Sequence, residues 1–143
     1  MKLYNHAVFN LGVSLVAGLQ VPEIVLIIFG GMIPDVVDSI LAGRDQRLFY
    51  AIHRTFSHYP WPYLVFYFAS YNFEVGQLVA FGALLHVLMD FLTPMGIPLV
   101  SPTKRVSLAK IKTGSMFDYI LTYCPLLGFL CNLYFTSGNP LFP

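Results

Sequence analysis

The stretch VGQLVAFGALLHVLMDFL, residues 75–92, indicates both the fold of the chain and the place of its chemistry. Its residues are apolar or small except for Gln77, His86 and Asp90. The length approaches the roughly 20 residues with which an α-helix crosses a bilayer. His86 and Asp90 are four residues apart, so an imidazole and a carboxylate share one face of the helix. The stretch therefore predicts a membrane helix with a polar pair near its C-terminal end.

Similar apolar runs occur along the rest of the chain. They lie at Ala7–Leu19, at Val21–Ile33 with an extension toward Ala42, at Pro62–Tyr71 and at Phe117–Phe135. Only residues 75–92 and Phe117–Phe135 approach a full span, so the other runs are expected to be tilted, re-entrant or partly buried. We therefore predict an all-α fold: a small multi-helix integral membrane protein with about five helical segments, some of them short or re-entrant, forming a single domain over residues 1–143.

Composition supports a membrane protein. Of the 143 residues, 57% are apolar, 16% are aromatic and only 10% are charged. Soluble domains contain about 25% charged residues, which is more than twice the fraction found here. The net charge of +1 lacks the basic excess of nucleic-acid-binding proteins, and the low polarity argues against disorder. We expect no nucleic-acid partner.

The charged residues are distributed as a membrane topology predicts. The basic residues are Lys2, then Arg44, Arg47 and Arg54 in one connection, and Lys104, Arg105, Lys110 and Lys112 in another. The intervening short links carry Glu23 and Glu74. If five segments alternate across the membrane, all basic clusters fall on one side, which the positive-inside rule makes cytoplasmic. We predict a multi-pass protein with a cytoplasmic N-terminus. A cleaved signal peptide is the alternative, which Asn5 and His6 disfavour because they interrupt its apolar start.

Imidazoles and carboxylates gather in a few short clusters. These are His6; Asp35 and Asp38; His53 and His58; and His86 with Asp90. An aspartate near the bilayer centre costs about 2.5–3.5 kcal/mol, so three uncompensated aspartates would cancel much of a domain's stability. In the predicted topology every cluster falls toward the cytoplasmic side. We therefore predict that these seven residues bind one or two divalent ions, with zinc favoured and manganese or iron as alternatives.

The same residues resemble those of the YdjM family of bacterial inner-membrane proteins, which are described as metal-dependent hydrolases and, by name, as LexA-binding. The resemblance covers roughly residues 6–102. It rests on His6 and on the segments GMIPDVVD (31–38), HRTFSH (53–58) and HVLMDFLTPMGIP (86–98). The family is distantly similar to zinc-dependent phospholipase C and to fungal single-strand nucleases. The resemblance implies a location in the bacterial inner membrane and phosphodiester chemistry.

The leading functional hypothesis is a membrane-embedded metal-dependent hydrolase of the phosphoric-ester class. It would cleave a phospholipid-like phosphoester at the cytoplasmic leaflet, using water activated by the metal. Arg54 and Ser57 are the predicted catalytic side chains, with Arg54 holding a phosphate oxygen. The basic loop from Lys104 to Lys112 would attract anionic membrane lipid.

Two alternatives stay open at this point. A small transporter, or a cation- or proton-conducting protein, would also use intramembrane His and Asp residues, although it should distribute them through the depth of the membrane. A non-catalytic scaffold would bind a regulator, such as the LexA-like partner that the family name implies. The chain could also form a homo-oligomer.

Overall fold

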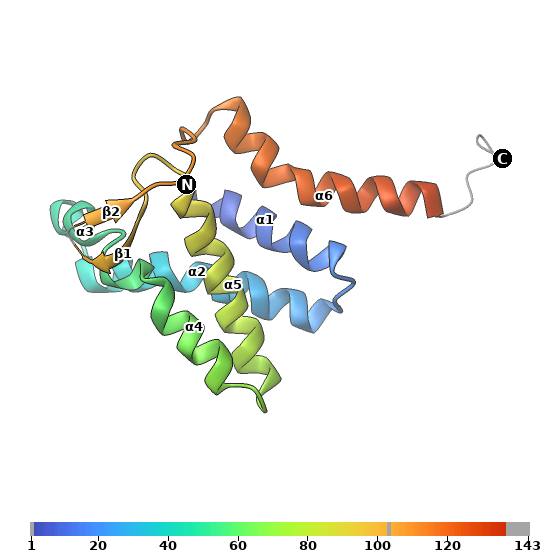
Figure 1. The fold of residues 1–143 in the computed structure, drawn as a ribbon, viewed down its shortest axis with the longest axis horizontal. Coiled ribbons are helices and arrows are strands. Elements are labelled where there is room, and N and C mark those ends of the chain that lie inside the picture. The colour runs from blue at the N-terminus through green and yellow to red at the C-terminus, as the bar shows by residue number, and fades with distance from the viewer. Residues whose placement is uncertain (1, 103, 137–143) are drawn as a thin grey trace.

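The computed structural model describes residues 2–102 and 104–136, and most of them are helical (Figure 1). The α-helices are α1 (Leu3–Val16), α2 (Val21–Ala42), α3 (Gln46–Ile52), α4 (Pro60–Ala69), α5 (Glu74–Phe91) and α6 (Met116–Thr136). A short 3₁₀ helix, η1 (Phe56–His58), precedes α4, and the strands β1 (Ile97–Ser101) and β2 (Lys104–Val106) form an antiparallel hairpin. The predicted all-α class is confirmed.

The five predicted segments correspond to α1, α2, α4, α5 and α6. Helices α2, α5 and α6 are long and apolar enough to cross a membrane by length and composition. Helix α4 has 10 residues, which reach about 15 Å, half of a bilayer's hydrocarbon thickness. The expectation that some segments would be short is therefore confirmed. The sequence analysis did not anticipate α3, η1 or the hairpin.

Helix α2 lies at the centre of the arrangement. It packs against α5 and α1, while α4 packs on the outer side of α5 and α6 packs on α1 (Figure 1). Glycines allow the close approach of α2 to α5. A Cβ atom added at Gly30 would lie 2.1 Å from the carbonyl oxygen of Val79, and one at Gly82 would lie 2.0 Å from that of Ile27. Small residues at helix crossings are typical of membrane helices, which associate by close packing.

Helix α1 has its polar side inside and its apolar side outside. Asn5, His6, Asn10 and Ser14 are fully buried, whereas Leu3 and Val16 are exposed. The buried amide of Asn10 donates to the carbonyl oxygens of Ile27 (3.1 Å) and Gly82 (3.3 Å), and so joins α1 to α2 and α5. An apolar exterior around a polar interior is unfavourable in water and favourable in lipid. The burial pattern thus agrees with the membrane prediction.

The hairpin folds back beside the end of α5. Gly96 has φ +65, and a Cβ atom there would lie 2.2 Å from the carbonyl oxygen of Val106, so the turn requires glycine. In the hairpin, Ile97 pairs with Val106, and Pro98 pairs with Arg105. This register places Arg105 beside the turn that follows α3, where its guanidinium donates to the carbonyl oxygen of His53 (3.0 Å).

Candidate metal centre

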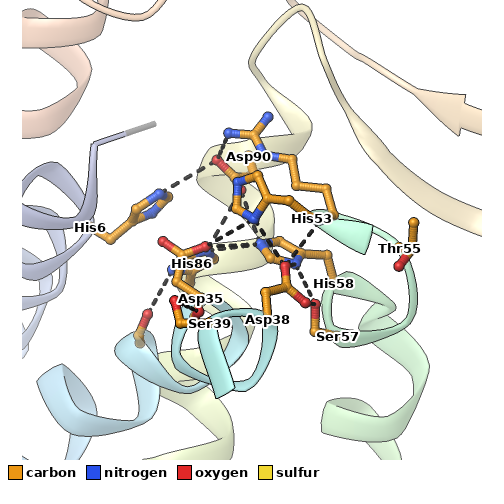
Figure 2. A network of polar contacts seen from close by, with 12 residues as sticks. His6, Asp35, Asp38, Ser39, His53, Thr55, Ser57, His58, His86 and Asp90 are labelled. Atoms are coloured by element: carbon orange, nitrogen blue, oxygen red, sulfur yellow. Dashed lines mark hydrogen bonds and ion pairs between the residues drawn. The ribbon is translucent and has the colours of Figure 1, made fainter. Parts of the chain in front are cut away.

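Seven side chains from four parts of the fold converge at one end of the helical arrangement (Figure 2). They are His6 of α1, Asp35 and Asp38 of α2, His53 and His58 around η1, and His86 and Asp90 of α5. The structure thus brings together every residue that the sequence analysis proposed as a metal ligand. Helical spacing aligns the pairs within α2 and α5, and the turn between α3 and α4 carries the two other histidines toward them.

His58, His86 and Asp90 form a triangle of donor atoms. The Nε2 atoms of the two histidines are 3.2 Å apart, and Oδ2 of Asp90 lies 3.3 Å from His58 Nε2 and 3.6 Å from His86 Nε2. Ligands at about 2.0–2.1 Å from a tetrahedral zinc ion lie roughly 3.3–3.4 Å from one another. The edges of the triangle therefore match one face of a zinc coordination tetrahedron.

Asp35 forms a second triangle on the same pair of histidines. Its Oδ1 atom lies 3.4 Å from His58 Nε2 and 3.6 Å from His86 Nε2. This oxygen is buried and has no hydrogen-bond partner within the usual geometric limits. A buried carboxylate oxygen without such a partner is costly unless a cation faces it. Asp35 would thus suit a further ligand for an ion held by His58 and His86.

Asp38 and His53 extend the cluster toward the α3–α4 connection. His53 Nδ1 lies 2.9 Å from Asp38 Oδ2 and 3.8 Å from Asp35 Oδ1. Together with His58, these residues offer donor atoms that all lie within 4.8 Å of one another. His53 and Asp35 are partly exposed, at 16% and 17% of the side chain. Solvent can therefore reach this side of the cluster.

The main chain of α2 fixes the ring orientation of His86. Its Nδ1 atom lies 2.6 Å from the carbonyl oxygen of Gly31, and a carbonyl oxygen can only accept. The proton of the neutral ring therefore lies on Nδ1, which leaves the lone pair of Nε2 directed toward His58 and the carboxylates. Metal-bound histidines are commonly held in this way through their second nitrogen.

His6 lies on the α1 side of the centre and is 1% exposed. Its ring stacks on that of His86, with centroids 3.7 Å apart, and its Nε2 atom is 3.5 Å from Asp90 Oδ1. Neither ring nitrogen has a hydrogen-bond partner of normal geometry. The donor atoms of His6, Asp35 and His86 form a further compact group. His6 is thus placed to ligate an ion on the side of the cluster opposite to His53.

Arg54, the predicted phosphate clamp, is buried next to Asp90. It is 4% exposed, and its guanidinium donates to Asp90 Oδ1 and to Thr93 Oγ1, both at 2.6 Å. Its backbone has φ +60, a conformation that non-glycine residues seldom adopt, and its backbone N–H donates to Asp38 Oδ2. Because Arg54 holds Oδ1 of Asp90, the other oxygen points to His58 and His86.

Ser57 supports two of the candidate ligands. Its hydroxyl lies 2.5 Å from Asp38 Oδ1 and 2.8 Å from His58 Nδ1. Around His58, burial disfavours the charged ring, but Asp35 and Asp90 outweigh this effect and raise the pKa of His58 above its ordinary value. Without a metal ion, the carboxylates therefore favour a proton on His58. A divalent cation would satisfy the same negative charge.

The sequence analysis did not predict three side chains that contact the residues of the centre. Thr93 accepts from Arg54 and donates to the carbonyl oxygen of Asp90, and Arg105 contacts the His53 carbonyl. Tyr63 donates its hydroxyl to the carbonyl oxygen of Ser57 (2.6 Å). Thr93 could have been suspected from its position three residues after Asp90. The others act through main-chain carbonyls of distant segments, for which a single sequence gives no signal.

The chain matches the family model described as "YdjM inner membrane protein" over residues 1–139. No curated protein and no solved structure matches it significantly.

Proposed function

This chain belongs to the YdjM inner membrane protein family, and we propose that it is a membrane-embedded, metal-dependent hydrolase that cleaves phosphoesters. The proposed centre holds one or two divalent ions, with zinc favoured. His58, His86, Asp90 and Asp35 are the inner ligands, and Asp38, His53 and His6 complete the set. We propose that the centre lies at the cytoplasmic leaflet of the bacterial inner membrane. In the predicted topology, the basic connections and the candidate ligands fall on the same side of the membrane, and the positive-inside rule makes that side cytoplasmic.

The observation that carries this proposal is the spacing of the donor atoms on the shared His58–His86 edge. Two triangles with edges of 3.2–3.6 Å meet there, one closed by Asp90 and the other by Asp35. A hydrogen-bonded network alone would pair each acceptor with a donor. Here Asp35 Oδ1 and both ring nitrogens of His6 are buried and form no hydrogen bond of normal geometry, and the polar contacts of Asp35 Oδ1 with His58 and of His6 Nε2 with Asp90 are 3.4 Å and 3.5 Å long. Nitrogen and carboxylate donors in this mixture suit zinc, manganese or iron.

The surrounding residues fit a hydrolytic site. A divalent ion held by these ligands lowers the pKa of water toward neutrality and stabilises charge on a phosphoryl oxygen. Arg54 and Ser57 fix the orientation of Asp90, Asp38 and His58, so that the donor atoms are arranged before an ion arrives. The partly exposed edge at Asp35 and His53 gives an anionic substrate access to the centre.

Transport is a weaker explanation of the same residues. A conducting path needs polar groups that are free to exchange a cation through the depth of the membrane. Farther along α1, the amide of Asn10 is bonded to two carbonyls, and the hydroxyl of Ser14 donates to the Asn10 carbonyl (2.7 Å). The Asn10 amide joins α1 to α2 and α5, and the Ser14 hydroxyl is bonded within α1, so neither group is free to pass a cation, whereas the described histidines gather at one end. A scaffold that binds a LexA-like regulator stays an untested alternative.

The test is hydrolysis by purified protein in lipid nanodiscs loaded with zinc or manganese. Substrates are bis-p-nitrophenyl phosphate and a fluorescent phospholipid, with released product as the readout. We expect metal-dependent turnover in the wild type, at least 100-fold loss in His86→Ala, and retention in the matched α5 variant Gln77→Ala. Bound metal with no turnover on either substrate would overturn the hydrolase and favour the scaffold. Metal-dependent cation uptake into vesicles would instead favour transport.

A further inference from the structure

An apolar groove lies next to the candidate metal centre, between α4, α5 and β1. It has a volume of about 420 Å³, within the usual range of about 300–1,000 Å³ for ligand pockets. The residues that matter here are Trp61, Leu64, Val87, Leu88, Ile97 and Leu99. Val87 and Ile97 form a buried floor, at 2% and 3% exposure, whereas Trp61 and Leu88 form an exposed rim. The groove is therefore built into the fold and opens outward.

On both walls of the groove, lining residues follow candidate metal ligands closely in the sequence. On α5, Val87 follows His86 and Phe91 follows Asp90, so the groove and the centre occupy neighbouring faces of the same turns, about 100° apart. On the other wall, Pro60 stands two residues after His58. The indole N–H of Trp61 donates to the carbonyl oxygen of Leu99 (2.5 Å), which ties α4 to β1 at this end.

Positive charge is carried by the strand that pairs with the β1 wall of the groove. β1, which contributes Ile97 and Leu99, pairs with β2, which carries Lys104 and Arg105. Arg105 pairs with Pro98, so its side chain lies on the hairpin face opposite to Ile97, and its guanidinium donates to the His53 carbonyl (3.0 Å) beside the metal centre. An apolar groove flanked by a basic strand and by the elements that carry the metal ligands is complementary to an anionic amphiphile.

We propose that this groove holds an acyl chain of a membrane phospholipid whose phosphate headgroup reaches the metal centre. The inference rests on the proposed hydrolase and identifies its substrate as an acyl lipid. Because an acyl chain in the bilayer is already in an apolar environment, the groove adds van der Waals packing rather than a hydrophobic driving force. Its role is therefore to position one chain, and with it the headgroup, more than to increase affinity.

The surroundings of the groove indicate that a lipid chain, rather than another molecule, occupies it. The chain is an inner-membrane protein, and α5 is long and apolar enough to span, so the exposed rim at Leu88 faces lipid. A phosphate ester without an acyl chain would use the centre and leave the groove unused. A docked helix from another protein would cover the rim and compete with lipid. Photocrosslinking separates these occupants.

The experiment uses the full chain in nanodiscs of phosphatidylcholine and phosphatidylglycerol, with a trace of phosphatidylglycerol that carries a diazirine on one acyl chain. Adducts are mapped by mass spectrometry after illumination. We expect adducts at Trp61, Leu64 and Leu88 to exceed those at Leu130 and Leu133, exposed positions of α6, by at least fivefold. Equal labelling at both places would overturn the inference.

Two variants distinguish lipid binding in the groove from hydrolysis at the metal centre. Leu88→Trp fills the rim and should reduce adducts at Leu64 at least fivefold, whereas Leu130→Trp, the matched exposed change on α6, should leave them unchanged. His86→Ala removes a proposed ligand and should keep the groove labelled, so loss of hydrolysis is distinguishable from loss of lipid binding. If Leu88→Trp weakens turnover of a soluble phosphoester as strongly as that of phospholipid, the groove does not select the acyl chain, and the inference is wrong.

Discussion

The Nε2 atoms of His58 and His86 lie 3.2 Å apart, although 28 residues separate them in the chain. His86 Nδ1 is engaged by the Gly31 carbonyl, so its Nε2 presents a lone pair to His58. Two imidazole nitrogens at this separation share either a proton or a cation. The two carboxylates directed at the same point, Asp35 and Asp90, favour a cation of higher charge.

Removal of either histidine from this pair should abolish tight metal binding. We expect His58→Ala and His86→Ala to weaken zinc binding at least 100-fold, because each change leaves one ligand fewer on the shared edge. Isothermal titration of metal-free protein with zinc measures this, and cobalt substitution adds the visible absorption of a tetrahedral centre. Gln77→Ala, on the same helix, is the control. Unchanged affinity in both histidine variants would rule out the proposed ligand set.

Arg54 should act as a positioning residue. Its guanidinium holds Asp90 Oδ1 at 2.6 Å, so Arg54→Gln frees the carboxylate to rotate away from the two histidines. Loss of such an outer contact typically weakens metal binding 10- to 100-fold. Arg54→Lys should restore part of the affinity, whereas Arg44→Gln, an exposed change in the same connection, should have no effect. If Arg54→Gln alters only the KM for a phosphoester and spares metal affinity, Arg54 is a substrate clamp, as the sequence first suggested.

Ser57 offers a more selective test. Its hydroxyl joins Asp38 Oδ1 to His58 Nδ1, so Ser57→Ala removes two contacts and should lower zinc affinity about tenfold while the helices stay folded. Ser39→Ala is the matched control, because the Ser39 hydroxyl donates only to the main-chain oxygen of Asp35 in its own helix (2.8 Å). Zinc titration and thermal unfolding are measured on the same samples. A Ser57→Ala variant with wild-type affinity but no turnover would make Ser57 catalytic.

The sequence was sufficient to predict the five apolar helices and to identify the seven side chains that converge, for different physical reasons. Apolar runs identify membrane helices because lipid tolerates few charges, and His86 and Asp90 are conspicuous within such a run. The sequence did not reveal that Arg54 turns inward. That depends on a backbone conformation at φ +60 and on Asp90 and Thr93, more than 30 residues away. The hairpin was missed because its two short strands lie in the connection between α5 and α6, where the cluster of basic residues indicated only a loop.

Membrane topology is testable with single cysteines. Cys124 and Cys131 are exposed, so both are first replaced by serine. The positive-inside pattern predicts that Lys104→Cys reacts with an impermeant maleimide only from the cytoplasmic side, and Glu74→Cys only from the opposite side. Right-side-out and inverted vesicles expose the outer and the cytoplasmic side of the membrane, respectively, to the maleimide. Labelling of both positions from the same side would contradict the predicted alternation, and labelling of Lys104→Cys from outside would invert the orientation.

The close approach of α2 and α5 should be essential for both stability and metal binding. A Cβ atom at Gly82 would lie 2.0 Å from the carbonyl oxygen of Ile27, a main-chain atom that cannot move without shifting α2. Gly82→Ala should therefore cost about 3 kcal/mol of unfolding free energy and weaken zinc binding, because the same shift separates Gly31 from His86.

Gly128→Ala provides the matched control. Gly128 also lies within a helix, but a Cβ atom there meets nothing within 4 Å, so this change should be neutral or slightly stabilising. Unfolding in mixed micelles and zinc titration measure the two effects in parallel. If Gly82→Ala lowers stability but leaves zinc affinity intact, the metal centre does not depend on the α2–α5 contact. Equal stability of the two variants would show that the helices are not in close contact at Gly82.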